Sequence, residues 1–383
     1  MRTYDYLVIG GGLTGLIIAR KLSQSGADVA LVEAESSIGG SHRPALLAKN
    51  KIENGLRFLP KNDLLIKALS QLETELNFPL IKNIKPVQQK TYEAAGFRDF
   101  LGFGEKAPAF YDQFKHFLTT EEVELTIPIY ELMEKLVADF TGEVLTRHIV
   151  TRFHSAADVS TENKNANKNL ITHVTVNGSK TLHAKNFVFC GPVRDLAVLM
   201  EDEQLNARAK AKLKKSAYWM AVQLDVVHQK PVTDTDHLYV LNGTTDDDIG
   251  PCVGRFFTLP APTDANASQN QLSQWISFID YDSSEEAENY GEVLKKMKRQ
   301  IKRAFPDSME QLVAERISVS PALTAGEIKL NANGALPTAQ NLWIASPSLN
   351  IFPNLTGAFL QAQLILSSLG FGAWVETPEL PIE

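Results

Sequence analysis

Cysteine is scarce in this chain of 383 residues: Cys190 and Cys252 are the only two, and they lie far apart. They can form neither a disulfide framework nor a zinc cluster, so a reducing compartment, the cytoplasm, is the predicted location. An excess of positive charge is also missing, since 38 basic and 45 acidic residues give a formal charge of −7. This balance argues against nucleic acid and anionic lipid surfaces as partners.

A membrane-length apolar run is absent as well. The nearest candidate, residues 355–374, is interrupted by Gln361 and Gln363 and has no basic flanks. The start of the chain carries an apolar run without a small-residue cleavage site, so we interpret it as a strand and not as a signal peptide. We therefore expect a globular protein with a buried helix near its C-terminus and no integral membrane segment.

The first forty residues contain a complete β-α-β unit. Residues 6–9 are a continuous apolar run typical of a strand buried on both faces, and Gly10-Gly11-Gly12-Leu13-Thr14-Gly15 follows at once. A helix is predicted after this turn and ends at Gly26, and residues 29–32 form a second strand that leads into Glu33. Together these features predict a dinucleotide-binding site.

Each glycine of the turn has a separate task. Gly10 permits the tight turn from strand to helix, Gly12 lets a pyrophosphate approach the backbone, and Gly15 lets helix and strand pack closely. The helix N-terminus offers unpaired N–H groups to the anion, and Glu33 lies where a carboxylate accepts hydrogen bonds from a ribose. The cofactor-binding residues predicted in this unit are Gly10, Gly12, Leu13, Thr14, Gly15, Glu33 and Ala34.

A second glycine pair, Gly39-Gly40, follows Glu33 and precedes Ser41-His42-Arg43. With this pair the sequence resembles the flavin-dependent amine oxidase superfamily, which includes phytoene desaturases and protoporphyrinogen oxidases. The resemblance implies an oxidoreductase with FAD as its cofactor, bound in part by Gly40, Ser41 and Arg43. His42 lies in the same loop, although positioning of the pyrophosphate by Ser41 or Arg43 is the simpler interpretation.

Four later segments carry the same resemblance. The cofactor-binding residues that it implies there are Gly55, Leu56, Arg57 and Phe58 beside the isoalloxazine ring, Val150 beside the adenine, Cys190 and Gly191 after a central strand, and Ser346, Leu355, Thr356 and Gly357 in a C-terminal signature. In that signature the last helix directs its N-terminus at the pyrimidine edge of the flavin. The family's usual Ala-Gly-Asp or Ala-Gly-Glu is replaced here by Ala345-Ser346-Pro347. The usual carboxylate is therefore missing, and Ser346 is left to form a hydrogen bond.

The implied fold class is α/β: a Rossmann-like FAD-binding domain of the glutathione-reductase type, amine-oxidase-like, with an inserted α+β substrate domain built on an antiparallel sheet. We predict that the FAD-binding domain comprises residues 1–60, 130–200 and 335–383, and the substrate domain residues 61–129 and 201–334.

Several elements can be placed inside these two domains. Asn177-Gly178 predicts a tight hairpin turn, and residues 143–153 are expected to form one strand. A charged helix is expected over residues 283–305, before Pro306. Strands are expected in the substrate domain over residues 218–227, 237–241, 252–259 and 272–281.

No nucleophilic triad, phosphate-binding P-loop or metal cluster stands out in the sequence. A bound flavin carries hydride chemistry itself, so the protein need only align a C–H bond, and we predict neither a catalytic acid or base nor a metal ligand. Five aromatic residues are interpreted either as walls of a flavin-facing pocket or as core packing: Tyr218, Trp219, Phe256, Phe257 and Trp275.

The expected function is transfer of a hydride from a C–N or C–C bond of a small organic substrate to FAD. A second nucleotide fingerprint is absent, so we expect electrons to enter from the substrate and to leave to oxygen, a quinone or another acceptor. Two alternatives stay open. One is a non-redox flavoenzyme of the UDP-galactopyranose mutase or isomerase type. The other is a flavin-binding protein without turnover that acts through a partner, which the missing carboxylate at Ser346 motivates.

Overall fold

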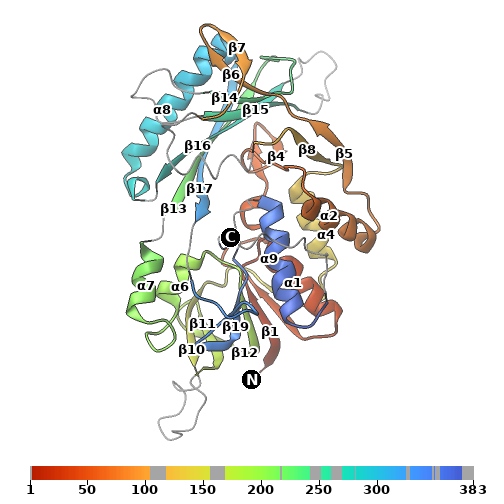
Figure 1. The fold of residues 1–383 in the computed structure, drawn as a ribbon, viewed down its shortest axis with the longest axis vertical. Helices are drawn as coiled ribbons and strands as arrows, with labels where there is room; N and C mark the ends of the chain where they lie inside the picture. The colour runs from red at the N-terminus through yellow and green to blue at the C-terminus, as the bar shows by residue number, and fades with distance from the viewer. Residues whose placement is uncertain are drawn as a thin grey trace, which may run out of the picture.

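The computed structural model has two large sheets, one in each half of an elongated molecule (Figure 1). The structure describes residues 2–103, 118–155, 169–215, 218–241, 252–259, 270–280, 282–324, 328–346, 349 and 354–372. The N-terminal β-α-β unit lies in the lower half of Figure 1, and the long antiparallel strands lie in the upper half.

The lower sheet has eight strands within the described residues: β1 (Thr3–Ile9), β2 (Val29–Val32), β9 (Glu143–Leu145), β10 (Val150–Ser155), β11 (Ile171–Val176), β12 (Lys180–Phe189), β18 (Ala335–Leu336) and β19 (Ala339–Ile344). The main order is β10-β11-β12-β1-β2-β9, and β19 joins the second half of β12. β1, β2, β9, β19 and the second half of β12 run parallel, so their carboxyl ends lie at one edge of the sheet.

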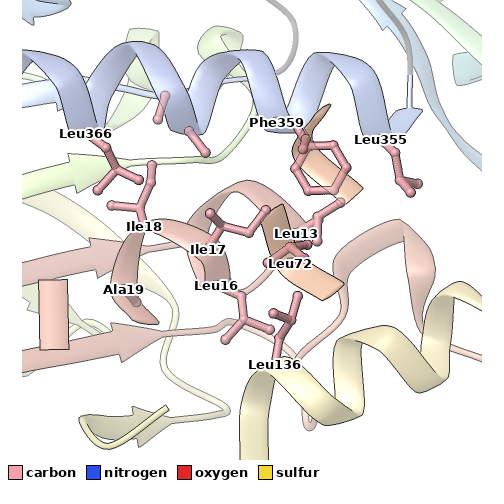
Figure 2. Close-up of a cluster of buried hydrophobic side chains, with 14 of the residues drawn as sticks. Leu13, Leu16, Ile17, Ile18, Ala19, Leu72, Leu136, Leu355, Phe359 and Leu366 are labelled. Atoms are coloured by element: carbon pink, nitrogen blue, oxygen red, sulfur yellow. The ribbon is translucent and has the colours of Figure 1, made fainter. Parts of the chain in front are cut away.

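Helices cover both faces of this sheet. One face is covered by α1 (Leu13–Gln24), α2 (Asp63–Leu76), α4 (Ile129–Ala138) and α9 (Asn354–Ser368), and the other by α6 (Leu196–Leu199) and α7 (Ala207–Lys214). Figure 2 shows α9 lying across α1, with Phe359 beside Leu13 and Leu366 beside Ile18. Phe359 and Ile18 are fully buried, and each such side chain contributes about 1.5–3 kcal/mol through burial. Among the described residues, none of the helices is long and apolar enough to cross a membrane.

The upper sheet has seven strands within the described residues: β6 (Gln89–Glu93), β7 (Gly96–Asp99), β13 (Tyr218–His228), β14 (Leu238–Leu241), β15 (Cys252–Thr258), β16 (Gln271–Asp280) and β17 (Leu312–Thr324). Their order is β17-β13-β16-β15-β14-β6-β7, with β14 and β6 as the parallel pair. Helix α8 (Ala287–Ala304) covers one face through Val293, Met297 and Ile301. The opposite face receives Leu56 and Phe58 from the segment between β4 (Asn50–Ile52) and α2.

The predicted α/β class with a second, antiparallel sheet is confirmed. The four strands expected in the upper sheet are present within one or two residues of their predicted bounds. The hairpin is also confirmed, because Asn177 and Gly178 connect β11 to β12 with positive φ angles of 52° and 73°. Helix α8 starts at Ala287, later than expected, because residues 283–285 form a separate 3₁₀ turn.

The prediction of one strand over residues 143–153 is wrong. The segment forms β9 beside β2 and β10 beside β11, at opposite edges of the sheet. Arg147, whose φ is 57°, lies in the turn that separates them. The residues between the two strands bind the end of β2 instead, since Arg147 N donates to Glu35 O at 2.8 Å and His148 N donates to Glu33 O at 2.9 Å.

The division into an FAD-binding and a substrate domain stays a proposal. Segment 61–129 contributes to both halves. Its α2 packs with α1 and α9, whereas its β6 and β7 extend the upper sheet. Two small sheets complete the described fold: β3 (Ala45–Leu47) with β4 (Asn50–Ile52), and β5 (Ile81–Pro86) with β8 (Glu121–Leu125).

Candidate cofactor site

The predicted site residues from distant parts of the chain gather at the carboxyl edge of the parallel strands. Ile9, Val32, Phe189 and Ile344 are the last residues of β1, β2, β12 and β19, and they stand next to one another in the sheet. Gly10, Glu33 and Cys190 therefore emerge side by side, with Ser346 two residues beyond β19. This edge is where open α/β sheets bind ligands.

The first glycine turn combines a close packing contact with an open space. A Cβ built at Gly15 would lie 2.0 Å from the carbonyl oxygen of Gly10, so the packing of α1 on β1 requires glycine there. Gly10 itself has a φ of +108°. Gly12 has no described protein atom within 4 Å of such a Cβ. The packing of the described residues therefore does not explain why position 12 is a glycine.

The second glycine pair lies against this open turn. Gly39 N donates to Gly11 O at 2.9 Å, and a Cβ at Gly40 would lie 3.0 Å from Gly12 Cα. Both glycines have positive φ angles, 136° and 54°. Arg43 folds back so that its Nε donates to Gly40 O at 3.2 Å. Ser41, in the same turn, is exposed.

Glu33 is buried at the end of β2 and joins two loops. Its Oε2 accepts a hydrogen bond from Gly11 N, and its Oε1 accepts one from Glu35 N, both at 2.8 Å. Each carboxylate oxygen has a second acceptor position for a ligand hydroxyl group. Ala34 beside it is exposed, and Val150 begins β10 after the segment that binds Glu33.

The segment around Gly55 is clamped between the two halves of the molecule. Gly55 has a φ of +80°, and a Cβ there would lie 1.8 Å from Gln223 Oε1 on β13. Arg57 Nη2 donates to Asn54 O at 2.6 Å and also to Ser41 O. Arg57 thus ties the segment beside Gly55 to the turn beside Gly40.

The N-terminus of α9 meets the same region. Asn62, which caps α2, donates from Nδ2 to Thr356 Oγ1 at 3.1 Å, and Thr14 Oγ1 lies 3.4 Å from Ala358 O. Leu355, Thr356 and Gly357 are buried in this first turn. The starts of α1, α2 and α9 therefore converge, and helix starts carry partial positive charge that favours an anionic ligand.

Three buried polar atoms near Arg57 have no hydrogen-bond partner among the described residues: His42 Nδ1, Glu53 Oε2 and Arg57 Nε. Burial, with the charge of Arg57 as a smaller cause, lowers the pKa of His42 to about 3, so this imidazole is neutral at physiological pH. Burial raises the pKa of Glu53, although Ile129 N at the start of α4 donates to its Oε1 at 2.5 Å. Unpaired buried polar atoms are costly, and together with the open space at Gly12 they fit a bound dinucleotide with hydrogen-bonding groups.

Comparison with known proteins identifies the domain. Residues 5–113 match the family model of the FAD dependent oxidoreductases (DAO). This part of the chain is similar to the FAD dependent oxidoreductases. The predicted cofactor, FAD, and the predicted enzyme class are thereby confirmed. A stretch of 40 residues, 10% of this chain and 9% of the relative, is 52% identical to glutathione reductase from Schizosaccharomyces pombe.

Solved structures share the fold of this FAD-dependent chain over nearly its full length. An oxidoreductase from Methanosarcina mazei is 13% identical, with a TM-score of 0.68 over 94% of this chain and 99% of the other. A protoporphyrinogen oxidase-like protein from Exiguobacterium sp. 255-15 is 12% identical, with a TM-score of 0.65 over 97% and 99%. Putrescine oxidase bound to putrescine is 10% identical, with the same TM-score and coverage. The resemblance to amine and protoporphyrinogen oxidases is confirmed at the level of the fold.

The aromatic residues divide between the two faces of the upper sheet. Phe256 and Trp275 pack under α8 with Met297, so the core interpretation holds for them. Trp219 and Phe257 are half-buried on the opposite face, with Leu56 and Phe58. The side chain of Tyr218 and residue Pro347 lie outside the described residues.

Sequence reasoning missed the polar residues around the Gly55 segment, chiefly Glu53, Asp225 and Arg316. The available signal was a pair of polar residues at alternate positions, Gln223 and Asp225, in the middle of a mostly apolar strand. Among the described residues, no group of three or more His, Cys, Asp or Glu side chains is arranged to hold a metal ion.

Proposed function

We propose that this chain is an oxidase or dehydrogenase of the amine oxidase and protoporphyrinogen oxidase type, which oxidises a C–N or C–C bond of a small organic substrate. The open space beside Gly12, at the end of β1 and against the second glycine pair, carries the proposal. When bound, FAD supplies the hydride acceptor. The chain's own residues bind it, orient the substrate and keep water out.

The proposed binding roles follow the positions of the residues. Gly10, Gly12, Leu13, Thr14 and Gly15 surround the pyrophosphate with Gly40, Ser41 and Arg43. Glu33 and Ala34 meet the ribose, and Val150 meets the adenine. The flavin end is held by Gly55, Leu56, Arg57, Phe58, Cys190, Gly191, Ser346, Leu355, Thr356 and Gly357.

Titration of the apoprotein with FAD tests the pyrophosphate position. Gly12→Ala should weaken FAD binding about tenfold or more while leaving the thermal stability of the apoprotein unchanged, because no described protein atom opposes the added methyl group. Gly291→Ala is the matched control. Its added methyl group also meets no described atom, and it lies in α8, far along the chain from the turn. Unchanged FAD affinity in Gly12→Ala would refute the assignment.

Anaerobic mixing of the FAD-loaded protein with candidate substrates tests the reaction. We propose that diamines such as putrescine, or other small organic donors, bleach the visible absorbance of the flavin. NADPH serves as the negative control, and rapid stoichiometric reduction by NADPH would contradict the proposal. Turnover of a substrate only after prior reduction of the flavin would instead favour the mutase or isomerase alternative. A cytoplasmic location also stays a proposal, which fractionation of source cells would test.

A further inference from the structure

The upper sheet holds three consecutive residues, Glu53, Asn54 and Gly55, the last of which begins the predicted flavin-contacting segment. Gln274 Nε2 donates to Glu53 O at 3.0 Å, and Arg316 Nη2 donates to Asn54 Oδ1 at 2.6 Å. At the third residue, Gly55, a Cβ would collide with Gln223 Oε1. Residues 53–55 therefore rest directly on side chains of β13, β16 and β17, through the backbone of Glu53 and Gly55 and the side chain of Asn54.

One buried carboxylate organises these donors. Asp225 is fully buried, its Oδ2 accepts a hydrogen bond from Arg316 Nη1 at 2.9 Å, and its Oδ1 accepts one from Gln274 Nε2 at 3.0 Å. Arg316 and Gln274 stand directly opposite Asp225 on the two neighbouring strands. Opposed residues share one face of a sheet, so the three side chains form a single row that faces residues 53–55.

Arg316 connects this row to a residue outside the upper sheet. Arg316 bonds Asp225 in the upper sheet and Asn54 in the FAD-binding half with different nitrogens of one guanidinium group. Arg57 Nη2 in turn donates to two carbonyl oxygens, that of Asn54 and that of Ser41. A planar guanidinium group can satisfy two fixed acceptors at once, whereas a lysine ammonium acts as a single point charge.

We propose that Arg316 and Asp225 are positioning residues for the bound flavin. They fix residues 53–55 from the upper sheet and thereby set the surface that the protein presents to the isoalloxazine ring. This inference rests on the proposed function, in which Gly55 and its neighbours contact the flavin. Neither residue touches the reacting atoms in this assignment, and both act through Asn54 and Glu53.

The other end of the same row supplies a matched control. Arg255 on β15 stands opposite Gln274, and its Nη1 bonds Glu122 Oε2 at 2.7 Å. Both partners of this pair are buried, with exposures of 5% and 7%. The pair has the same chemistry as Asp225–Arg316, with an arginine side chain that is more deeply buried, 6% exposed against 26% for Arg316. In the described structure no hydrogen bond connects it to residues 53–55.

The experiment compares Arg316→Lys and Asn54→Ala with Arg255→Lys in the FAD-loaded protein. The readouts are the FAD dissociation constant, the visible spectrum of the bound flavin, its midpoint potential and the thermal unfolding temperature. Both Arg316→Lys and Asn54→Ala should weaken FAD binding about tenfold and shift the spectrum and potential in the same direction. Arg255→Lys should lower the unfolding temperature and leave the flavin spectrum and potential as in the wild type.

The outcomes separate positioning from general stability. If both Arg316→Lys and Asn54→Ala keep the wild-type spectrum, potential and FAD affinity, the positioning role is refuted, whatever happens to the unfolding temperature. If Arg316→Lys does not fold, Asn54→Ala still decides, because it leaves the Asp225–Arg316 pair intact. A wild-type protein that takes up no FAD would refute the proposed function itself. If the wild type binds FAD and the variants behave like it, only the positioning role of Arg316 and Asp225 is refuted.

Discussion

Acid should destabilise the packing of α1, α2 and α4 through one carboxylate, Glu75 of α2. Its Oε2 accepts a hydrogen bond from Arg20 Nη1 at 2.6 Å, and Lys21 and Gln71 also donate to the carboxylate. Arg20 is a charged residue of α1 with an exposure of only 1%, and its Nε binds Asp139 at 2.6 Å. This network joins α1, whose N-terminus forms the glycine turn, to α2 and to the end of α4.

The size of the effect follows from the pKa of Glu75. Burial by itself would raise this pKa, but the hydrogen bonds from Lys21, Arg20 and Gln71 outweigh burial and lower it from 4.5 to about 2. A carboxylate with a lowered pKa in the folded state contributes stability that is complete above pH 4.5 and is lost as the pH falls toward 2. The difference, roughly 2.5 pH units, corresponds to about 3 kcal/mol.

Urea unfolding of the apoprotein between pH 7 and pH 3 measures the larger part of this contribution, about 2 kcal/mol, because the folded pKa of about 2 lies below this range. Glu75→Gln should be less stable than the wild type at pH 7, because the variant leaves Arg20 buried without one of its two carboxylate partners. It should also lose much less stability on acidification. Glu134→Gln is the control, since Glu134 forms an exposed pair with Lys51 and such pairs contribute under about 1 kcal/mol. Equal pH dependence in the wild type and Glu75→Gln would refute the reasoning.

Three further substitutions test other parts of the fold. Gly15→Ala should lower the unfolding temperature of the apoprotein, unlike Gly12→Ala, because its methyl group meets Gly10 O; equal unfolding temperatures would contradict this. Glu33→Ala should weaken FAD binding and cost about 1–3 kcal/mol in urea unfolding, since Gly11 N loses its acceptor; unchanged FAD occupancy would count against the ribose assignment. Met297→Ala should cost about 2–5 kcal/mol by opening the core under α8, with FAD affinity unchanged in titration.

The features predicted well from the sequence are those encoded by neighbouring residues. The turn from β1 to α1 contains four glycines within six positions, and the packing at Gly15 explains one of them directly. The hairpin at Asn177-Gly178 is likewise local, because the positive φ angles belong to the two turn residues. The helix after the glycine turn was predicted as well, although the sequence does not reveal that Arg20 is buried beside two carboxylates distant in sequence.

The features predicted poorly depend on contacts between distant segments. Residues 143–145 and 150–155 have similar strand-forming composition, and which edge of the sheet each joins is decided by pairing with β2 and β11. Strand β17 was not assigned at all, and its Arg316 finds Asp225 about ninety positions earlier. The alternation of Gln223 and Asp225 shows that one face of β13 is polar, but it does not reveal that this face meets residues 53–55.

In the proposed assignment, where Gly55 contacts the flavin, FAD binding and the junction between the two halves depend thermodynamically on each other. A ligand that binds only the assembled site stabilises it, by about 2.7 kcal/mol at a hundred times its dissociation constant. By reciprocity, a change that weakens the contacts of Asp225 and Arg316 with residues 53–55 must lower the binding free energy of that ligand by the same amount. If FAD is held through this segment, as we propose, a change in the upper sheet alters the flavin site without any direct contact to the flavin.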